Sequence, residues 1–125
     1  MTLTGSRSPL TILVAEDNES VRRLVCSVLT QAGYHVMAAA DGVEALDVAE
    51  SHAGEFALLL TDVKMPRLGG LELARSLHAK WPGILVALMS ANPTDVTIGD
   101  PAWRFIQKPF KPAELVKTVR EMLHQ

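Results

Sequence analysis

The stretch "LLLTDVKMPRLGG", residues 58–70, runs from residues typical of a buried core straight into a carboxylate and a turn. Three leucines lead into Thr61 and Asp62, and a proline and two glycines then break the chain. A charged group costs free energy wherever water is partly excluded. A carboxylate at the end of a core strand therefore needs a partner or a function.

Strand-like and helix-like patterns alternate five times along the chain. Short apolar runs predict strands at 9–15, 34–39, 56–61, 84–90 and 104–107. Amphipathic patterns predict the intervening helices, with starts at Asn18, Asp41, Gly70 and Pro112. Gly33 is a plausible C′ residue of the first helix, and Glu44 completes a capping-box-like pattern with Asp41. Near-continuous apolar strands between amphipathic helices indicate an α/β fold with a parallel sheet covered on both faces.

Polar residues stand where the predicted strands end. Parallel strands joined by right-handed crossovers point the same way, so their carboxyl ends share one edge of the sheet. Glu16 and Asp17 follow the first strand, Asp62 the third, Ser90 the fourth and Lys108 the fifth. In open α/β sheets this edge holds the ligand site. We therefore expect these five side chains to converge.

Three carboxylates in one place require a cation. At separations of about 4–6 Å each pair would repel by about 1–4 kcal/mol at intermediate dielectric. A few hard oxygen ligands favour Mg²⁺, which keeps several waters and shares its shell with phosphate, whereas Ca²⁺ needs more ligands. Zinc is disfavoured, because the four histidines are scattered and the chain has a single cysteine.

The same residues supply what phosphoryl transfer needs, which is a nucleophile, a metal and positive charge for the phosphoryl oxygens. Asp62 can act as the nucleophile and form an aspartyl phosphate. Lys108 can pair with Asp62 at rest and with the phosphoryl group afterwards. The hydroxyl of Ser90 can donate a hydrogen bond to a phosphoryl oxygen.

These motifs resemble those of the receiver domains of two-component response regulators. The matching pieces are "ILVAEDN", "LLLTDVKMPRLGG", "ALMSA" and "RFIQKPF", and the resemblance runs from about Leu10 to Leu123. It implies a flavodoxin-like (βα)5 fold, doubly wound, with strand order 2-1-3-4-5. It also implies a Mg²⁺-dependent phosphorelay switch that takes a phosphoryl group from a sensor histidine kinase or a histidine phosphotransfer protein.

The resemblance assigns a role to each matching position. The implied metal ligands are Glu16, Asp17, Asp62 and the backbone carbonyl of Lys64; the catalytic residues are Asp62, Ser90 and Lys108; and the switch residues are Ser90 and Phe105. The Lys108–Pro109 peptide becomes a candidate for the cis form, which sequence alone gives only a minority prior. Arg22 and Arg23 read as solvated charges of the first helix.

The sequence departs from the family between Ser90 and Lys108. This segment is short, and Pro93, Gly99 and Pro101 interrupt it among residues that are mostly weak helix formers. We therefore expect the fourth helix of the family to be reduced to about one turn or replaced by a loop. This puts the family's common dimer surface in doubt.

Two other functions fit the fold less well. A receiver-like interaction module that is never phosphorylated is the main alternative, and the intact acidic pair argues against it. A flavodoxin-like cofactor protein is disfavoured because acidic residues, rather than a Gly- or Ser/Thr-rich phosphate loop, follow the first strand. The motifs do not separate a stand-alone regulator from the receiver of a hybrid histidine kinase.

Composition sets the remaining expectations. The 125 residues, 48% of them hydrophobic, suit one domain, with a flexible segment at 1–9 and the receiver domain at 10–125. A formal net charge of −2 gives no case for nucleic acid or an anionic membrane as a partner. The lone Cys26 and the lack of a long apolar run favour a cytoplasmic protein. We expect a monomer or weak dimer, with no enzymatic activity beyond its own phosphorylation and dephosphorylation.

Overall fold

A computed structural model describes residues 9–92, 94 and 100–124. All five predicted strands are present, as β1 (Thr11–Ala15), β2 (His35–Ala39), β3 (Leu58–Asp62), β4 (Leu85–Ser90) and β5 (Arg104–Gln107). The helices of the described residues are α1 (Glu19–Gln31), α2 (Gly42–Ser51), α3 (Gly70–Lys80) and α4 (Pro112–Leu123).

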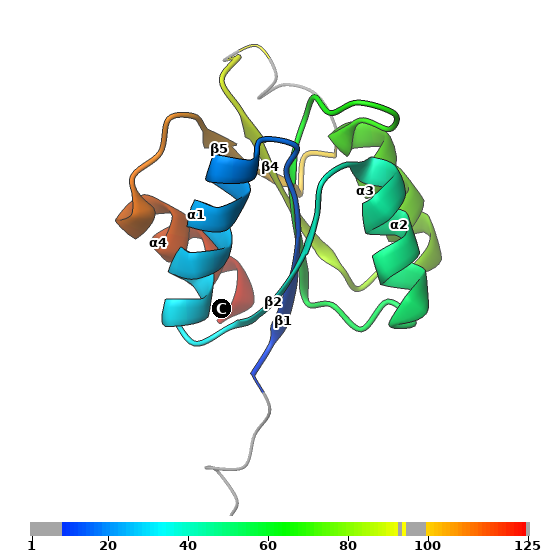
Figure 1. Cartoon of the computed structure of the whole chain (residues 1–125). Coiled ribbons are helices and arrows are strands. Elements are labelled where there is room, and N and C mark those ends of the chain that lie inside the picture. Colours follow the sequence, from blue (N-terminus) through cyan, green and yellow to red (C-terminus); the bar gives the residue numbers. More distant parts are fainter. Residues whose placement is uncertain (1–8, 93, 95–99, 125) are drawn as a thin grey trace, which may run out of the picture.

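The strands form one parallel sheet in the order β2-β1-β3-β4-β5, which confirms the predicted topology. Helices α1 and α4 cover one face, and α2 and α3 cover the other (Figure 1). The register pairs Ala15 with Thr61, Asp62 with Met89 and Ser90 with Gln107. The carboxyl ends of β1, β3, β4 and β5 therefore lie next to one another at one edge.

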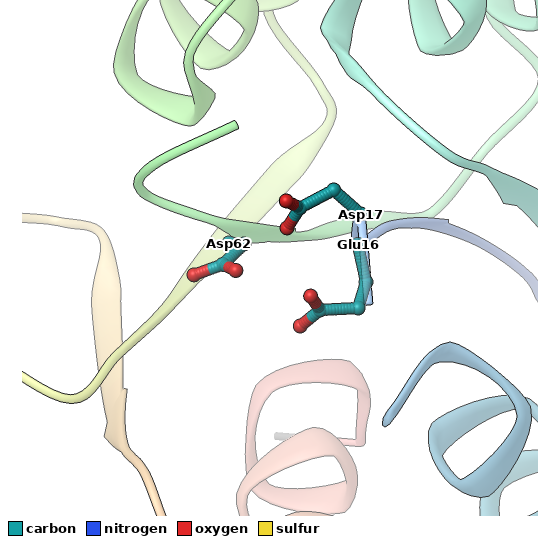
Figure 2. A group of neighbouring side chains, drawn as sticks. All are labelled: Glu16, Asp17 and Asp62. Carbon is teal, nitrogen blue, oxygen red and sulfur yellow. The ribbon is translucent and has the colours of Figure 1, made fainter. Parts of the chain in front are cut away.

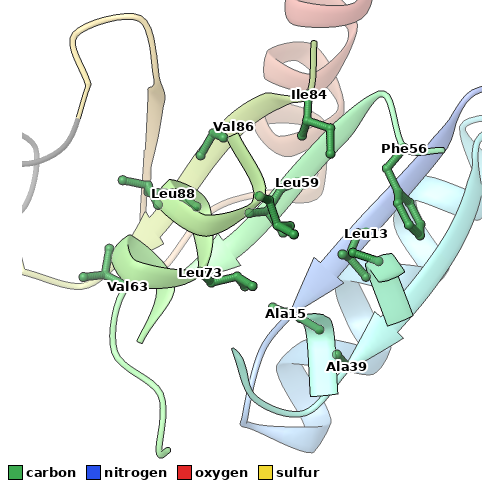
Figure 3. Packing of buried hydrophobic residues seen from close by; sticks show 14 residues of the cluster. Leu13, Ala15, Ala39, Phe56, Leu59, Val63, Leu73, Ile84, Val86 and Leu88 are labelled. Atoms are coloured by element: carbon green, nitrogen blue, oxygen red, sulfur yellow. The ribbon is translucent and has the colours of Figure 1, made fainter. Parts of the chain in front are cut away.

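The core has two layers, one on each face of the sheet. In β1, Leu13 and Ala15 belong to the cluster under α2 and α3, part of which Figure 3 shows, while Ile12 and Val14 belong to the cluster under α1 and α4. All four are fully buried. Because successive side chains of a strand point to opposite faces, a strand covered on both sides must be apolar throughout.

The predicted helix ends are confirmed with one difference. The side chain of Asn18 accepts a hydrogen bond from the Val21 backbone N–H at 3.0 Å, and Gly33 after α1 has φ +103°. Asp41 caps α2 by accepting from the Glu44 N–H at 2.9 Å. The Glu44 carboxylate, however, accepts from the N–H of Ala40, one residue before the position that a capping box would use.

Replacing the cap of α1 tests this assignment. Asn18→Ala is expected to lower the free energy of unfolding by about 1 kcal/mol, because an N–H at the start of the helix loses its acceptor. Asn18→Ser, which keeps an acceptor, is expected to cost much less. Urea denaturation of the three proteins measures the effect, and equal losses in both variants would contradict it.

The described residues form four helices, and none of them lies between β4 and β5. This agrees with the prediction that the fourth helix of the family is shortened or replaced by a loop. Residues 93 and 95–99, on which much of that prediction falls, lie outside the described residues, as do residues 1–8 of the predicted N-terminal segment. Within the described residues, no helix has both the length and the apolar character needed to span a membrane.

Candidate functional site

Three carboxylates meet beyond the ends of β1 and β3. Glu16 and Asp17 follow β1, and Asp62 is the last residue of β3 (Figure 2). One carboxylate oxygen from each lies within 4.8 Å of those of the other two. Glu16 is buried, Asp62 is half-buried and Asp17 is exposed. The arrangement therefore runs from the protein interior to solvent.

Lys108, which follows β5, reaches into this carboxylate group. Its Nζ lies 2.6 Å from Oε1 of Glu16 and 3.1 Å from Oδ2 of Asp62. Its backbone N–H donates to the Ser90 carbonyl at 2.8 Å, and the Lys108–Pro109 peptide is cis, as the resemblance suggested. The structure thus brings Lys108 into contact with two of the three carboxylates, as the sequence predicted.

The electrostatics separate the two carboxylates that contact Lys108. Burial raises the pKa of Asp62 to about 6, even though the hydrogen bond from Lys108 opposes this, and the nearby charge of Glu16 adds to the rise. Burial acts in the same direction on Glu16, but hydrogen bonds from Lys108 and the Asn18 N–H outweigh it, so the pKa of Glu16 is lowered. Burial disfavours the charged form of Lys108, yet its two carboxylate partners raise its pKa. Asp62 is therefore the carboxyl group most ready to change its ionisation.

Arg22 makes a contact with the loop after β1 that the sequence did not predict. Its Nη1 donates to the backbone carbonyl of Glu16 at 2.8 Å, and its side chain is half-buried rather than fully solvated. The other oxygen of the Glu16 carboxylate, Oε2, accepts from the Asn18 N–H at 3.0 Å. The loop between β1 and α1 is thus held from both its backbone and its side chains. No spacing pattern in the sequence predicts that an arginine near the start of α1 donates a hydrogen bond to a backbone carbonyl that precedes the helix.

Gly70 explains why the quoted stretch ends as it does. A Cβ on Gly70 would lie 1.9 Å from the carbonyl oxygen of Asp62, so α3 can begin there only with glycine. The same carbonyl accepts from the Thr61 hydroxyl at 2.9 Å. The Gly70 N–H donates to the Val63 carbonyl at 2.8 Å. The start of α3 therefore packs directly on the backbone that carries Asp62.

The remaining predicted residues lie at or near the ends of β3, β4 and β5. Ser90 ends β4 and is buried, and its hydroxyl oxygen accepts from the Asn92 N–H at 3.0 Å. Phe105 pairs with Leu88 across β4 and β5, is half-buried and packs against the cluster under α2 and α3. Lys64 lies two residues beyond Asp62 with an exposed side chain.

The donor set fits a hard divalent cation. In the described residues, Glu16, Asp17 and Asp62 are the one group of three potential ligands that lie close enough to share an ion. All their donor atoms are carboxylate oxygens, which suits Mg²⁺ and disfavours Zn²⁺. The ammonium group of Lys108 offsets part of the negative charge. An exposed Asp17 beside a buried Glu16 leaves one side of the group open to solvent.

The chain belongs to the family of response regulator receiver domains, whose model matches residues 12–120. Sensor kinase CckA of Brucella abortus (strain 2308) is 36% identical over 127 residues, which cover 98% of this chain and 13% of that protein. The response regulator receiver protein CpdR of the same strain is 34% identical over 118 residues, which cover 90% of this chain and 95% of CpdR.

Solved structures agree with this assignment. The Vibrio cholerae chemotaxis protein CheY4 has a TM-score of 0.81 at 28% identity, covering 92% of this chain and 99% of that one. The receiver domain of the hybrid histidine kinase CckA has a TM-score of 0.79 at 32% identity, covering 91% and 99%. The chain therefore matches nearly all of CpdR and of these solved chains, but only a small part of full-length CckA.

Proposed function

We propose that this chain is a phosphorelay switch that accepts a phosphoryl group on Asp62 in a Mg²⁺-dependent reaction. The observation that carries the proposal is the position of Asp62. Its carboxylate lies at the end of a central strand, within 4.8 Å of two other carboxylates and 3.1 Å from the Lys108 ammonium. A pKa raised by burial and a cation at contact distance are features of a functional carboxylate.

Glu16, Asp17 and Asp62 would hold the metal, with the Lys64 carbonyl as a further candidate ligand. When bound, Mg²⁺ would supply positive charge that reduces the repulsion between the acceptor carboxylate and an incoming phosphoryl group. The fit rests on an oxygen-only donor set that is open to solvent on the side of Asp17.

In the transfer step, a carboxylate oxygen of Asp62 forms a bond to phosphorus as the P–N bond of a phosphohistidine breaks. The electron pair of that bond stays on the imidazole nitrogen of the donor, which then takes up a proton. Lys108 is within reach to move from Asp62 to a phosphoryl oxygen, and the Ser90 hydroxyl can donate to another. The donor would be a sensor histidine kinase or a histidine phosphotransfer protein.

The output of the switch would be a shift in population between two surfaces around β5. Attraction of the Ser90 hydroxyl towards a phosphorylated Asp62 would open space beside β4, into which Phe105 could rotate. The half-buried position of Phe105, next to Leu88, supports this. Cytoplasmic location, a monomeric or weakly dimeric state and the absence of nucleic acid or membrane partners remain predictions from composition.

The test is phosphorylation by a small donor. Purified protein incubated with acetyl phosphate and Mg²⁺ is expected to gain the mass of one phosphoryl group, measured by intact mass spectrometry. Replacing Mg²⁺ with EDTA should prevent the gain. Asp62→Asn should remove it, because the amide lacks the nucleophilic carboxylate. Asp47→Asn, an exposed aspartate of α2, is the matched control and should react like the wild type.

The outcome separates the two leading functions. A wild-type protein that binds no phosphoryl group from acetyl phosphate or from a phosphorylated phosphotransfer domain would favour the non-phosphorylated interaction module. A gain that persists in Asp62→Asn would move the acceptor to another residue and overturn the proposal.

A further inference from the structure

We propose that the ion pair between Asp41 and Arg67 holds the β3–α3 loop in its metal-binding conformation, which makes Arg67 a positioning residue for Mg²⁺. This inference rests on the proposed function, because it concerns the loop that follows Asp62 and carries Lys64. Neither Asp41 nor Arg67 belongs to the predicted ligands or catalytic residues. The two lie 26 positions apart in the sequence, in different loops.

The pair has the two-pronged geometry of a strong arginine–carboxylate contact. Nε of Arg67 donates to Oδ2 of Asp41 at 3.0 Å, and Nη2 donates to Oδ1 at 3.1 Å. The aspartate is already fixed, because Oδ1 also accepts the Glu44 N–H that caps α2. Its side chain is 16% exposed, against 59% for the arginine. Asp41 is therefore an anchor at the start of α2, and Arg67 is the more exposed partner that it binds.

The backbone of Arg67 gives a reason for such an anchor. Its φ is +68°, a left-handed conformation that residues other than glycine seldom adopt. The Leu68 N–H donates to the Pro66 carbonyl at 2.8 Å, so Arg67 is the central residue of a tight γ-turn. A γ-turn with positive φ at its centre is rare and strained. Such a turn persists where surrounding contacts determine it.

The segment from the end of β2 to the start of α2 touches both loops that carry the carboxylates. Its Ala39 carbonyl accepts from the Glu16 N–H at 3.1 Å, and two residues later Asp41 binds Arg67. A Cβ on Gly42 would lie 2.3 Å from the Leu68 carbonyl oxygen, so the start of α2 packs closely on the β3–α3 loop. One short segment thus fixes the acidic-pair loop on one side and the γ-turn on the other.

The size of the effect follows from the exposure of the pair. Because Arg67 is more than half exposed, the contact is worth at most about 1 kcal/mol, which corresponds to a shift of about fivefold in the population of the held loop. Arg67→Ala is therefore expected to weaken Mg²⁺ binding by about two- to fivefold. Global stability should change little.

The first experiment is a Mg²⁺ titration followed by amide chemical shifts. Arg67→Ala and Asp41→Asn should weaken binding to similar extents, since asparagine still caps α2 but loses the charge. The double variant should be no weaker than either single one. Arg67→Lys should recover only part of the affinity, because a lysine lacks the planar fork. Arg104→Ala, which breaks an exposed ion pair with Glu121 far from these loops, is the matched control.

Two further readouts distinguish positioning from a merely structural contribution. In the phosphorylation assay, Arg67→Ala should raise the Mg²⁺ concentration needed for half-maximal rate and leave the rate at saturating Mg²⁺ unchanged. In metal-free protein, hydrogen exchange should become faster in the peptide covering residues 64–70, where the Gly70 N–H bonds Val63 and the Leu68 N–H bonds Pro66. Exchange in α4 should be unchanged.

Failure of this inference is distinct from failure of the proposed function. If the wild type binds Mg²⁺ and is phosphorylated while Arg67→Ala matches it in affinity and in loop exchange, the pair is a simple surface contact and the inference is wrong. If the wild type neither binds Mg²⁺ nor gains a phosphoryl group, the proposed function fails first, and the inference fails with it.

Discussion

Lys108→Ala is expected to lower the free energy of unfolding of the metal-free protein by about 3 kcal/mol at pH 7. The ammonium group contacts the carboxylate of Glu16, whose side chain is 1% exposed, at 2.6 Å, and it also contacts Asp62 at 3.1 Å. Removing it leaves a buried carboxylate without its charged partner, and an uncompensated buried charge is costly. Arg104→Ala should cost less than about 1 kcal/mol, because both members of its ion pair are more than 40% exposed.

The same variant tests whether Lys108 occupies the place of a metal charge. Without the ammonium group, Glu16 and Asp62 repel each other and Asp17 more strongly, so a divalent cation gains affinity for the three carboxylates. Mg²⁺ should therefore raise the melting temperature of Lys108→Ala by more than that of the wild type. Urea denaturation in EDTA and thermal melts with and without Mg²⁺ measure the two effects. A variant as stable as the wild type in EDTA, or one indifferent to Mg²⁺, would contradict this account.

The positions of the main site residues could be predicted from sequence, because topology alone determines them. An alternation of apolar strands and amphipathic helices indicates parallel strands, and parallel strands bring their carboxyl ends to one edge. Glu16, Asp62 and Lys108 are far apart in the chain but each directly follows or ends a strand. Their meeting also required the strand order 2-1-3-4-5, which the family resemblance implied, and the structure confirms both the direction and the order.

The difference between Glu16 and Asp17 could not be predicted in this way. The two are neighbours in sequence and alike in chemistry, yet one is buried and the other exposed. Which of them turns inward depends on the path of the loop after β1, which hydrogen bonds from Arg22 and the Asn18 N–H hold. Those contacts depend on where α1 and the loop lie in three dimensions. The pattern of residue types along the chain does not predict this.

The ion pair between Asp41 and Arg67 shows a second limit of the same kind. The capping role of Asp41 is a local property, and the sequence predicts it. Its second role depends on the close approach of α2 to the β3–α3 loop, which Gly42 permits. No pattern in the sequence predicts this close approach. Local chemistry is therefore readable along the chain, whereas contacts between two loops are not.

Asp62→Asn is expected to make the metal-free protein more stable by about 2–3 kcal/mol at pH 7.5, although it removes the proposed phosphoacceptor. Burial raises the pKa of Asp62 from 3.8 to about 6 in the folded protein. Well below pH 3.8 the carboxyl group is protonated in both the folded and the unfolded states, so it adds no pH dependence there. Between about pH 4 and 6 the unfolded chain ionises first, so the wild type loses stability as the pH rises through this window.

The asparagine variant cannot ionise at this position and should escape that loss. Its advantage should be small at pH 4, grow through pH 6 and stay constant above it, as measured by urea denaturation in EDTA at a series of pH values. Asp47→Asn, at an exposed position, should show no such growth. Saturating Mg²⁺ should shrink the advantage, because the wild-type carboxylate is then stabilised by the cation. Two results would contradict this account: an asparagine variant less stable than the wild type at pH 7.5, or a gain in stability that does not depend on pH. Either result would mean that burial does not disfavour the charge of Asp62, so that holding this carboxylate at the end of β3 has no cost in stability.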